Sequence, residues 1–227
     1  MKKSILTLVL LFVFSSAFAG GPYFCDKAGL SLYYERYEAE SGKLLRTTQL
    51  DFVSVRQEDG GQTVEYEMLL SKPNGRPLYG DRALLTTEIA ADGEVLVDLS
   101  ANARMVLKNI FPSVNMDCVS AAAVLPAGMR PGDRLPDAHG LVTAAGLKYT
   151  IDLTEREVLR TERLSTPAGV FDCMVERECK EENGPMYNRK TWSVTWYAEG
   201  IGYIRHDTYD KKMNLLSSEV LTRIDTH

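Results

Sequence analysis

The sequence predicts an all-β, mostly antiparallel fold: a curved meander sheet forming a half-barrel or barrel, with at most one or two short helices. Apolar and polar residues alternate in several runs, as in Val64 to Met68, so one face of such a strand is buried and the other is wet. Turn signals such as Asp92-Gly93 separate the runs. At least nine strand patterns follow one another, which is typical of an up-and-down sheet.

The first half of the expected domain, about residues 28–111, consists of strand patterns followed by one helix pattern. Ser100 is placed to cap a short helix over Ala101 to Phe111, and Pro112 stops it. The strands are expected at Leu30 to Tyr37, Leu44 to Arg56, Val64 to Met68, Leu84 to Ala90 and Val95 to Leu99.

A connector rich in proline and glycine, residues 112–138, follows this half. Its segment Asp117 to Val124 reads as a short strand or as irregular structure. A linker between two domains is one interpretation of the connector. We favour a crossover packed within a single domain, residues 20–227, because apolar side chains recur in it and can return to the sheet: Leu125, Met129 and Leu135.

Strand patterns resume in the second half, about residues 139–226. In its most regular strand, Trp192, Val194 and Trp196 share one face, and Thr191, Ser193 and Thr195 share the other. The remaining strands are expected around Tyr149 to Leu153, Glu157 to Leu164, Phe171 to Val175, Ile201 to Tyr209 and Leu215 to Ile224.

The first 19 residues read as a secretory signal peptide that is removed. Lys2 and Lys3 precede an apolar run, and Ala17-Phe18-Ala19 forms a cleavage site. The run is shorter than the ~20 apolar residues of a spanning helix. Cys25 does not directly follow the cleavage site, which favours a soluble protein of the periplasm or extracellular space over a lipid-anchored one. No transmembrane segment is expected.

Charge and cysteine content set further bounds. A net charge of −5 with scattered basic residues argues against nucleic-acid binding. In an oxidising compartment the four cysteines are candidates for disulfides. Cys173 and Cys179 lie six residues apart on one expected strand. In an extended strand they would be about 20 Å apart, which is too far for a disulfide. The other two pairings and a partly reduced state stay open. The cysteines are Cys25, Cys118, Cys173 and Cys179.

The sequence contains no recognisable catalytic, metal or cofactor motif. His139, His206 and His227 lack the spacing of metal ligands, and neither a nucleophile elbow nor a phosphate loop is present. His139 lies in a turn and could approach Cys118 or Asp133 in space, yet no local signature supports catalysis. We therefore expect a protein that is not an enzyme.

Aromatic residues suggest the one candidate site. If the sheet is a half-barrel, an aromatic face can line an apolar cavity for a lipid or a similar small molecule. The plainer alternative is an ordinary core filled by the same rings. The candidate ligand-binding residues are Tyr34, Tyr66, Trp192 and Trp196.

Three motifs in the C-terminal half of the chain occur in a characteristic order. They are Met129-Arg130-Pro131-Gly132-Asp133-Arg134-Leu135-Pro136-Asp137, then Thr166-Pro167-Ala168-Gly169-Val170-Phe171-Asp172-Cys173, then Trp196-Tyr197-Ala198-Glu199-Gly200-Ile201-Gly202-Tyr203-Ile204. This set resembles the TapB-like secreted or envelope proteins of Gram-negative bacteria and their neighbouring domain-of-unknown-function family. The resemblance covers about half of the mature chain and implies a curved antiparallel sheet. It brings no catalytic residues.

These observations lead to two hypotheses of different classes. The first is a periplasmic or secreted binding module for an apolar or amphipathic ligand. The alternative is a cell-envelope interaction or scaffold protein that binds another envelope protein and no small molecule. An open concave face would favour the first, whereas a filled interior with an apolar outer patch would favour the second.

Overall fold

A computed structural model describes residues 20–227 except 59, 111–112, 114, 121 and 186. The expected signal peptide, residues 1–19, and the helix stop at Pro112 lie outside the described residues. The described elements are β1 (Leu30–Glu38), β2 (Leu44–Glu58), β3 (Gly61–Ser71), β4 (Ala83–Ala90), β5 (Val95–Val97), α1 (Ala101–Ile110), β6 (Met116–Ser120), β7 (Ala123–Leu125), β8 (Ala138–Ala144), β9 (Leu147–Thr166), β10 (Gly169–Gly184), β11 (Tyr187–Ala198), β12 (Gly202–Tyr209) and β13 (Leu215–Thr226).

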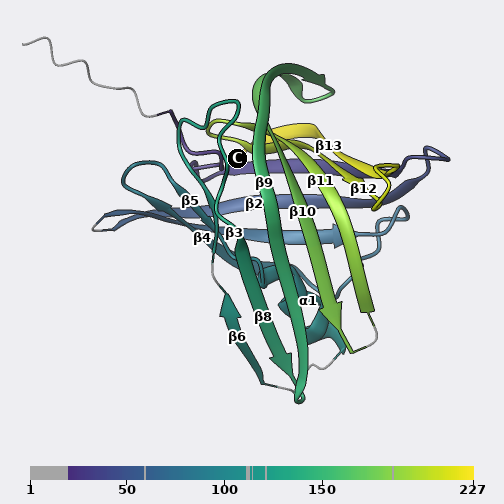
Figure 1. The fold of residues 1–227 in the computed structure, drawn as a ribbon. Helices are drawn as coiled ribbons and strands as arrows, with labels where there is room; N and C mark the ends of the chain where they lie inside the picture. Colours follow the sequence, from purple (N-terminus) through teal and green to yellow (C-terminus); the bar gives the residue numbers. More distant parts are fainter. Residues whose placement is uncertain (1–19, 59, 111–112, 114, 121, 186) are drawn as a thin grey trace, which may run out of the picture.

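These strands form one antiparallel sheet of 13 strands in the order β6-β8-β9-β10-β11-β12-β13-β1-β2-β3-β4-β5-β7. The sheet is curved and open, with β6 and β7 as its two edges, so the half-barrel is confirmed and the closed barrel is not formed. Figure 1 shows β8–β11 crossing in front of β2–β4, with α1 between the two layers. The concave face is therefore the face that carries α1.

Both expected halves contribute to this one sheet. The link is β1, which pairs with β2 on one side and with β13, the last strand, on the other. The connector between the halves contains β6 and β7, and its apolar residues Leu125, Met129 and Leu135 are buried in the core as expected. The connector thus contributes two strands and buried side chains to the same sheet.

Two irregularities bend the long hairpin of β9 and β10. The register shifts between Val175 and Glu176 and again after Arg177, where Glu155 has a positive φ of 53° on the opposite strand. A bulge offsets the alternation of faces. As a result, the consecutive residues Val175 and Glu176 are both buried, at 0% and 1% exposure.

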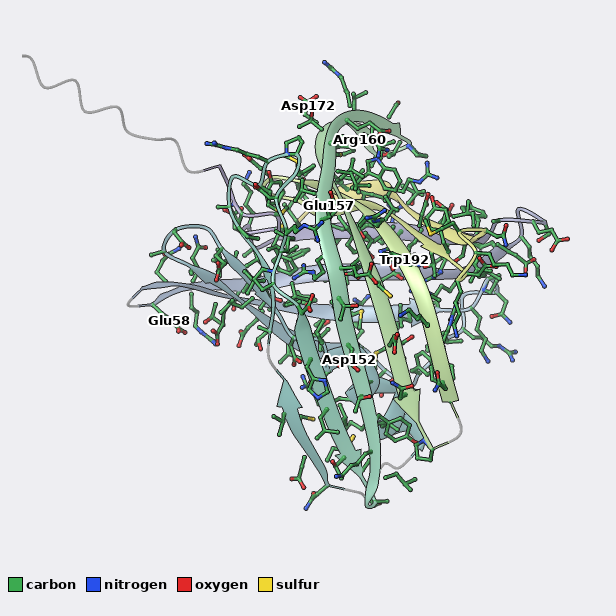
Figure 2. All side chains as sticks on the ribbon, in the orientation of Figure 1. Glu58, Asp152, Glu157, Arg160, Asp172 and Trp192 are labelled. Atoms are coloured by element: carbon green, nitrogen blue, oxygen red, sulfur yellow. The ribbon has the colours of Figure 1, made fainter. Side chains whose placement is uncertain are left out.

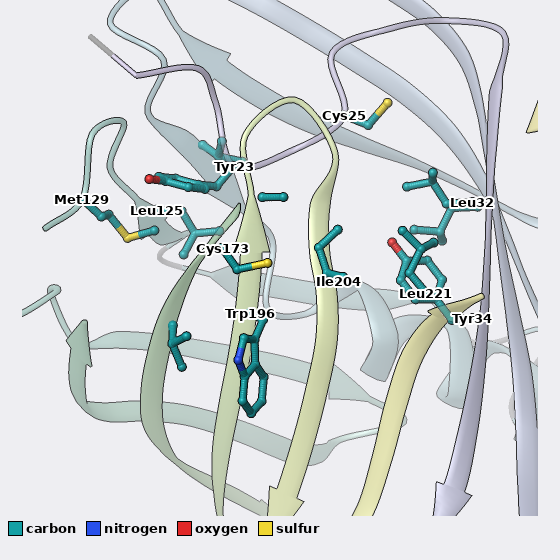
Figure 3. Close-up of a cluster of buried hydrophobic side chains, with 14 of the residues drawn as sticks. Tyr23, Cys25, Leu32, Tyr34, Leu125, Met129, Cys173, Trp196, Ile204 and Leu221 are labelled. Atoms are coloured by element: carbon teal, nitrogen blue, oxygen red, sulfur yellow. The ribbon is translucent and has the colours of Figure 1, made fainter. Parts of the chain in front are cut away.

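The segment before β1 fills one end of the concave face. Tyr23 and Cys25 are buried, and the ring of Phe24 lies edge-on to Phe52 at 5.7 Å and to Tyr66 at 5.5 Å. Figure 3 shows Tyr23 and Cys25 within the apolar cluster that also contains Met129. This end of the half-barrel is a packed core.

The helix α1 is short, as expected, and closes the other end. Its buried Leu107 packs against Val142 and Ala144 of β8. Ser100 precedes the helix, but its hydroxyl donates to Asp98 Oδ1 at 2.6 Å. Across the described part of the chain, no helix combines the length and the apolar character needed to cross a membrane.

The four candidate disulfide cysteines carry free thiols in this structure. Cys25, Cys173 and Cys179 are buried, and Cys118 is exposed on the edge strand β6. Burial, followed by the nearby carboxylates of Glu162 and Asp172, raises the pKa of the Cys173 thiol to about 11. This thiol is therefore protonated and inert at neutral pH.

Candidate ligand-binding face of the sheet

The central strand β11 shows what each face of the sheet presents. Directly opposed residues on neighbouring strands share a face, so the pairing of Lys180 with Thr191 and of Lys180 with Leu153 places all three on one face. Leu153 belongs to the face of β8 and β9 on which α1 packs. Thr191, Ser193 and Thr195 therefore face the concave side, and the two tryptophans face the convex side.

On the convex face, arginines cover the tryptophans. The guanidinium carbons of Arg160 and Arg205 lie 5.9 and 5.0 Å from the ring centre of Trp196. Arg177 lies 5.3 Å from the ring of Trp192 and pairs with Glu157 at 3.0 Å. Figure 2 labels Trp192 on β11, and Glu157 and Arg160 on β9. This arrangement shields the outer face of the central strands with cation–π contacts.

Tyr34 and Tyr66 lie on the concave side, but inside the packed end. Tyr34 is 1% exposed and stacks on Tyr203, with ring centres 4.3 Å apart. Tyr66 stacks on Phe52 and contacts Phe24. The structure thus divides the four expected ligand-binding residues between two faces and does not bring them together. Their role in binding stays a prediction.

Small hydroxyl side chains cover the middle of the concave face. Register places Ser193 opposite Thr208, and Thr208 opposite Ser217. Small residues suit the inner face of a strongly curved sheet, where side chains converge, and their hydroxyls make that face polar. We call these five buried residues the hydroxyl floor: Thr191, Ser193, Thr195, Thr208 and Ser217.

Two arginines share one buried carboxylate beside this floor. Glu219, whose side chain is 5% exposed, accepts from Arg46 Nη2 at 3.0 Å and from Thr48 Oγ1 at 2.7 Å. Arg36 Nη1 lies 3.6 Å from the same carboxylate, and Arg36 Nη2 donates to Thr208 and to Ser217 of the floor at 2.8 Å. Burial raises the pKa of Glu219, but Arg46 and Arg36 outweigh it and hold that pKa below its usual value.

His206 lies between the floor and the two arginines. Its Nδ1 is 2.9 Å from the Thr195 hydroxyl oxygen. Burial, followed by the positive charge of Arg36, lowers the pKa of His206 to about 4. The imidazole is therefore neutral at pH 7 and able both to donate and to accept a hydrogen bond.

Further basic residues extend this region toward the turn between β10 and β11. Arg189 is exposed and lies opposite Glu182 in the register of β10 and β11. Lys180 is 32% exposed and pairs with Glu182 at 2.8 Å. We call Arg36, Arg46, Lys180 and Arg189 the basic band. Positive charge gathers here, although the whole chain has a net charge of −5.

Two tyrosines, Tyr149 and Tyr187, form what we call the aromatic shelf, beside the exposed end of the basic band. Tyr187 is 47% exposed, precedes Arg189 by two residues and faces the same side. The ring of Tyr149 covers Gly184, where an added Cβ would lie 2.5 Å from it, so only glycine permits this contact. The concave face thus carries the hydroxyl floor, the basic band and, at the exposed end of that band, the aromatic shelf.

A buried ion cluster holds the open seam of the sheet. Arg156 of β9 is 1% exposed; its Nε lies 3.0 Å from Glu176 and 3.5 Å from Glu178. Its Nη1 donates to the carbonyl oxygens of Val124, on the edge strand β7, and of Pro136. Burial, and then Glu178, raise the pKa of Glu176, whereas Arg156 lowers it to a smaller extent.

The two other histidines lie apart from this face. His139 Nδ1 contacts Asp152 Oδ1 at 2.6 Å on exposed surface, and His227 Nε2 contacts Ser31 Oγ at 2.8 Å. Among the residues that the structure describes, no group of three or more His, Cys, Asp or Glu side chains is placed to hold a metal ion.

Comparison with known proteins assigns the fold to a family. Residues 27–221 match the family model described as DUF3108-like. The chain belongs to the DUF3108-like family. The name TapB-like, which the motifs suggested, is not confirmed by this match, whereas membership of a family of unknown function is. No curated protein matches the chain.

Two solved structures resemble this DUF3108-like chain. One is an inferred exported protein with a YmcC-like fold from Bacteroides fragilis NCTC 9343, with 22% identity, a TM-score of 0.73, and coverage of 91% of this chain and 100% of that chain. The other is an inferred lipoprotein from Parabacteroides distasonis ATCC 8503, with 20% identity, a TM-score of 0.74, and coverage of 91% and 99%. At this identity the likeness concerns the fold.

Sequence reasoning missed the basic band and the hydroxyl floor of this DUF3108-like protein. The alternation in Trp192 to Trp196 defines two faces correctly, but a curved sheet buries polar as well as aromatic faces. One signal was available: Thr191, Ser193 and Thr195 are small hydroxyl residues at every second position, which suits the crowded inner side of a bend.

Proposed function

We propose that this chain is an exported binding module, periplasmic or secreted, that holds an amphipathic ligand on the concave face of its half-barrel. The observation that carries the proposal is the change in character along that face. The basic band and hydroxyl floor suit a polar head, and the exposed Tyr187 on the adjoining shelf suits an apolar tail. Amphipathic molecules match a surface of this kind because each part finds its own environment.

The packed end of the half-barrel argues against a wholly apolar ligand. Phe24 packs edge-on against the stacked pair of Phe52 and Tyr66, and Tyr34 is covered by Tyr203. An apolar molecule seated there would have to displace these rings, each of which contributes to the core. The ligand is therefore placed at the polar and aromatic part of the concave face.

Native mass spectrometry of protein purified from a Gram-negative envelope extract tests this function. We expect an adduct of defined mass that is lost on denaturation and is absent from an unrelated exported protein prepared in parallel. A Ser193→Leu variant, which fills part of the floor, should carry less of the adduct. Consistently ligand-free protein, together with no binding of added amphiphiles, would contradict the proposal.

A further inference from the structure

The charges on the concave face are unbalanced. Four cations, Arg36, Arg46, Lys180 and Arg189, lie on the same face as the carboxylates of Glu219 and Glu182. Glu176 and Glu178 face the same side, opposite Thr195 and Ser193, and Arg156 pairs with both of them at the seam. Outside that cluster, Arg36 and Arg46 share the one carboxylate of Glu219, and Arg189 has no ion-pair partner among the described residues.

The surplus charge is also incompletely hydrogen-bonded. Arg46 Nε is buried and has no hydrogen-bond partner among the described residues. The side chain of Arg189 makes no ion pair or hydrogen bond with any described residue and is exposed to solvent. Guanidinium groups with free donors suit oxyanions, which can accept from several N–H groups at once.

Placing like charges together opposes folding. Burial is the largest cause that lowers the pKa of Arg36, and the positive charge of Arg46 is the next largest. The charge of Arg189 lowers this pKa further. Such repulsion on a half-buried surface is relieved by a bound anion. A carboxylate ligand carries one negative charge, whereas a phosphate monoester carries up to two at neutral pH and so matches the surplus.

We propose that the basic band binds the phosphate group of an amphipathic phosphomonoester, with Arg46 and Arg189 as its principal donors. This inference rests on the proposed function, since it identifies the head group of the same ligand. The buried hydroxyl floor fixes the position of Arg36 in the band through Thr208 and Ser217. The aromatic shelf at Tyr187 receives the start of the apolar chain.

Calorimetric titration with three probes tests the inference: dodecyl phosphate, dodecyl maltoside and inorganic phosphate. We expect the parent protein to bind dodecyl phosphate at least tenfold more tightly than dodecyl maltoside, whose head group is uncharged. Raising the salt concentration should weaken only the binding of the phosphates, because screening acts on the charged head.

Matched variants separate a head-group site from general charge. Arg189→Gln removes an exposed, unpaired cation. It should weaken the binding of dodecyl phosphate three- to tenfold and leave the binding of dodecyl maltoside unchanged. Arg46→Gln should act in the same way. Arg223→Gln is the control: it removes another exposed arginine, which stacks on Tyr33 on the opposite face of β13, and it should not change binding.

The outcomes distinguish the two proposals. If both amphiphiles bind equally well and Arg189→Gln has no effect, the phosphate site is overturned and the binding module stands. If inorganic phosphate binds as tightly as dodecyl phosphate and responds to Arg189→Gln, the anion site stands and the amphipathic ligand is rejected. If none of the probes binds, both proposals fall.

Discussion

The side chain of His206 lies in the concave face with its Nδ1 against the Thr195 hydroxyl and the charges of Arg36 and Lys180 close by. Protonation would place a further positive charge among these cations. Nothing in the local sequence Arg205-His206-Asp207 indicates this environment, because the adjacent Asp207 faces the other side, where it binds Arg205 and Ser218. Register alone decides which neighbours the imidazole meets.

A pH dependence of stability follows from this position. Burial and Arg36 lower the pKa of His206 to about 4, below the 6.5 of a free histidine. A lowered pKa contributes stability that is complete above pH 6.5 and is lost as the pH falls toward 4, because the unfolded chain then binds the proton more readily. We expect His206 to account for about 3 kcal/mol of the stability lost over this range.

Chemical denaturation at pH 7 and pH 4 measures this effect. The free energy of unfolding of His206→Gln should fall less between the two values than that of the parent protein. The exposed His139 provides the control, and His139→Gln should retain the acid-induced loss of the parent. If the parent and His206→Gln lost the same free energy of unfolding between pH 7 and pH 4, the buried His206 would not be a source of the acid sensitivity.

At the scale of elements, β9 provides a side chain that connects two parts of the curved sheet that no described strand pairing joins. Its bulge at Glu155 shifts the alternation, so that Arg156 points into the interior and reaches the carbonyl oxygens of Val124 and Pro136. Among the strands that the structure describes, no pairing joins β9 to β7. The guanidinium therefore replaces ladder hydrogen bonds across the seam.

We expect Arg156→Ala to destabilise the protein by about 3–5 kcal/mol, because it leaves Glu178 and Glu176 buried without their counter-charge. Arg160→Ala on the same strand is the matched control. Its side chain is 50% exposed, and its loss should cost about 1 kcal/mol or less. Denaturant unfolding followed by circular dichroism measures both, and equal costs would contradict the role of the seam cluster.

At the scale of the whole molecule, the pairing of β1 with β13 joins the two ends of the chain. The first half cannot complete its sheet without the last strand, because β1 would become an exposed edge. Contacts between such distant residues form late and together, so the two halves are expected to unfold as one unit. Leu221 of β13, which is fully buried opposite Tyr34, lies at this junction.

Hydrogen exchange measured by mass spectrometry in increasing denaturant tests this unity. Peptides covering residues 44–71 and 169–198 should lose protection at the same denaturant concentration. Leu221→Ala should lower both midpoints together, at a cost of about 2–5 kcal/mol for a large-to-small core substitution. Loss of protection in one segment well before the other would show two separate folding units.

Much of the fold could be predicted from local patterns. Alternation predicted the antiparallel strands, Asp92-Gly93 marked a turn, and the apolar residues Leu125, Met129 and Leu135 indicated a packed connector. The candidate site could not be predicted in the same way. Tyr34 and Trp196 are both buried aromatic residues, yet they lie on opposite faces of the sheet.

The sequence by itself determined the strands, their turns and the composition of each of their two faces. Only the tertiary structure decided which face became concave, and therefore that Thr191, Ser193 and Thr195 line the interior while the tryptophans are covered by arginines. The physical reason is that alternation with a period of two separates the two faces of a strand but does not indicate which face becomes concave. The direction of curvature arises from bulges and from pairing between distant strands, and these also gather the basic band from β1, β2, β10 and β11.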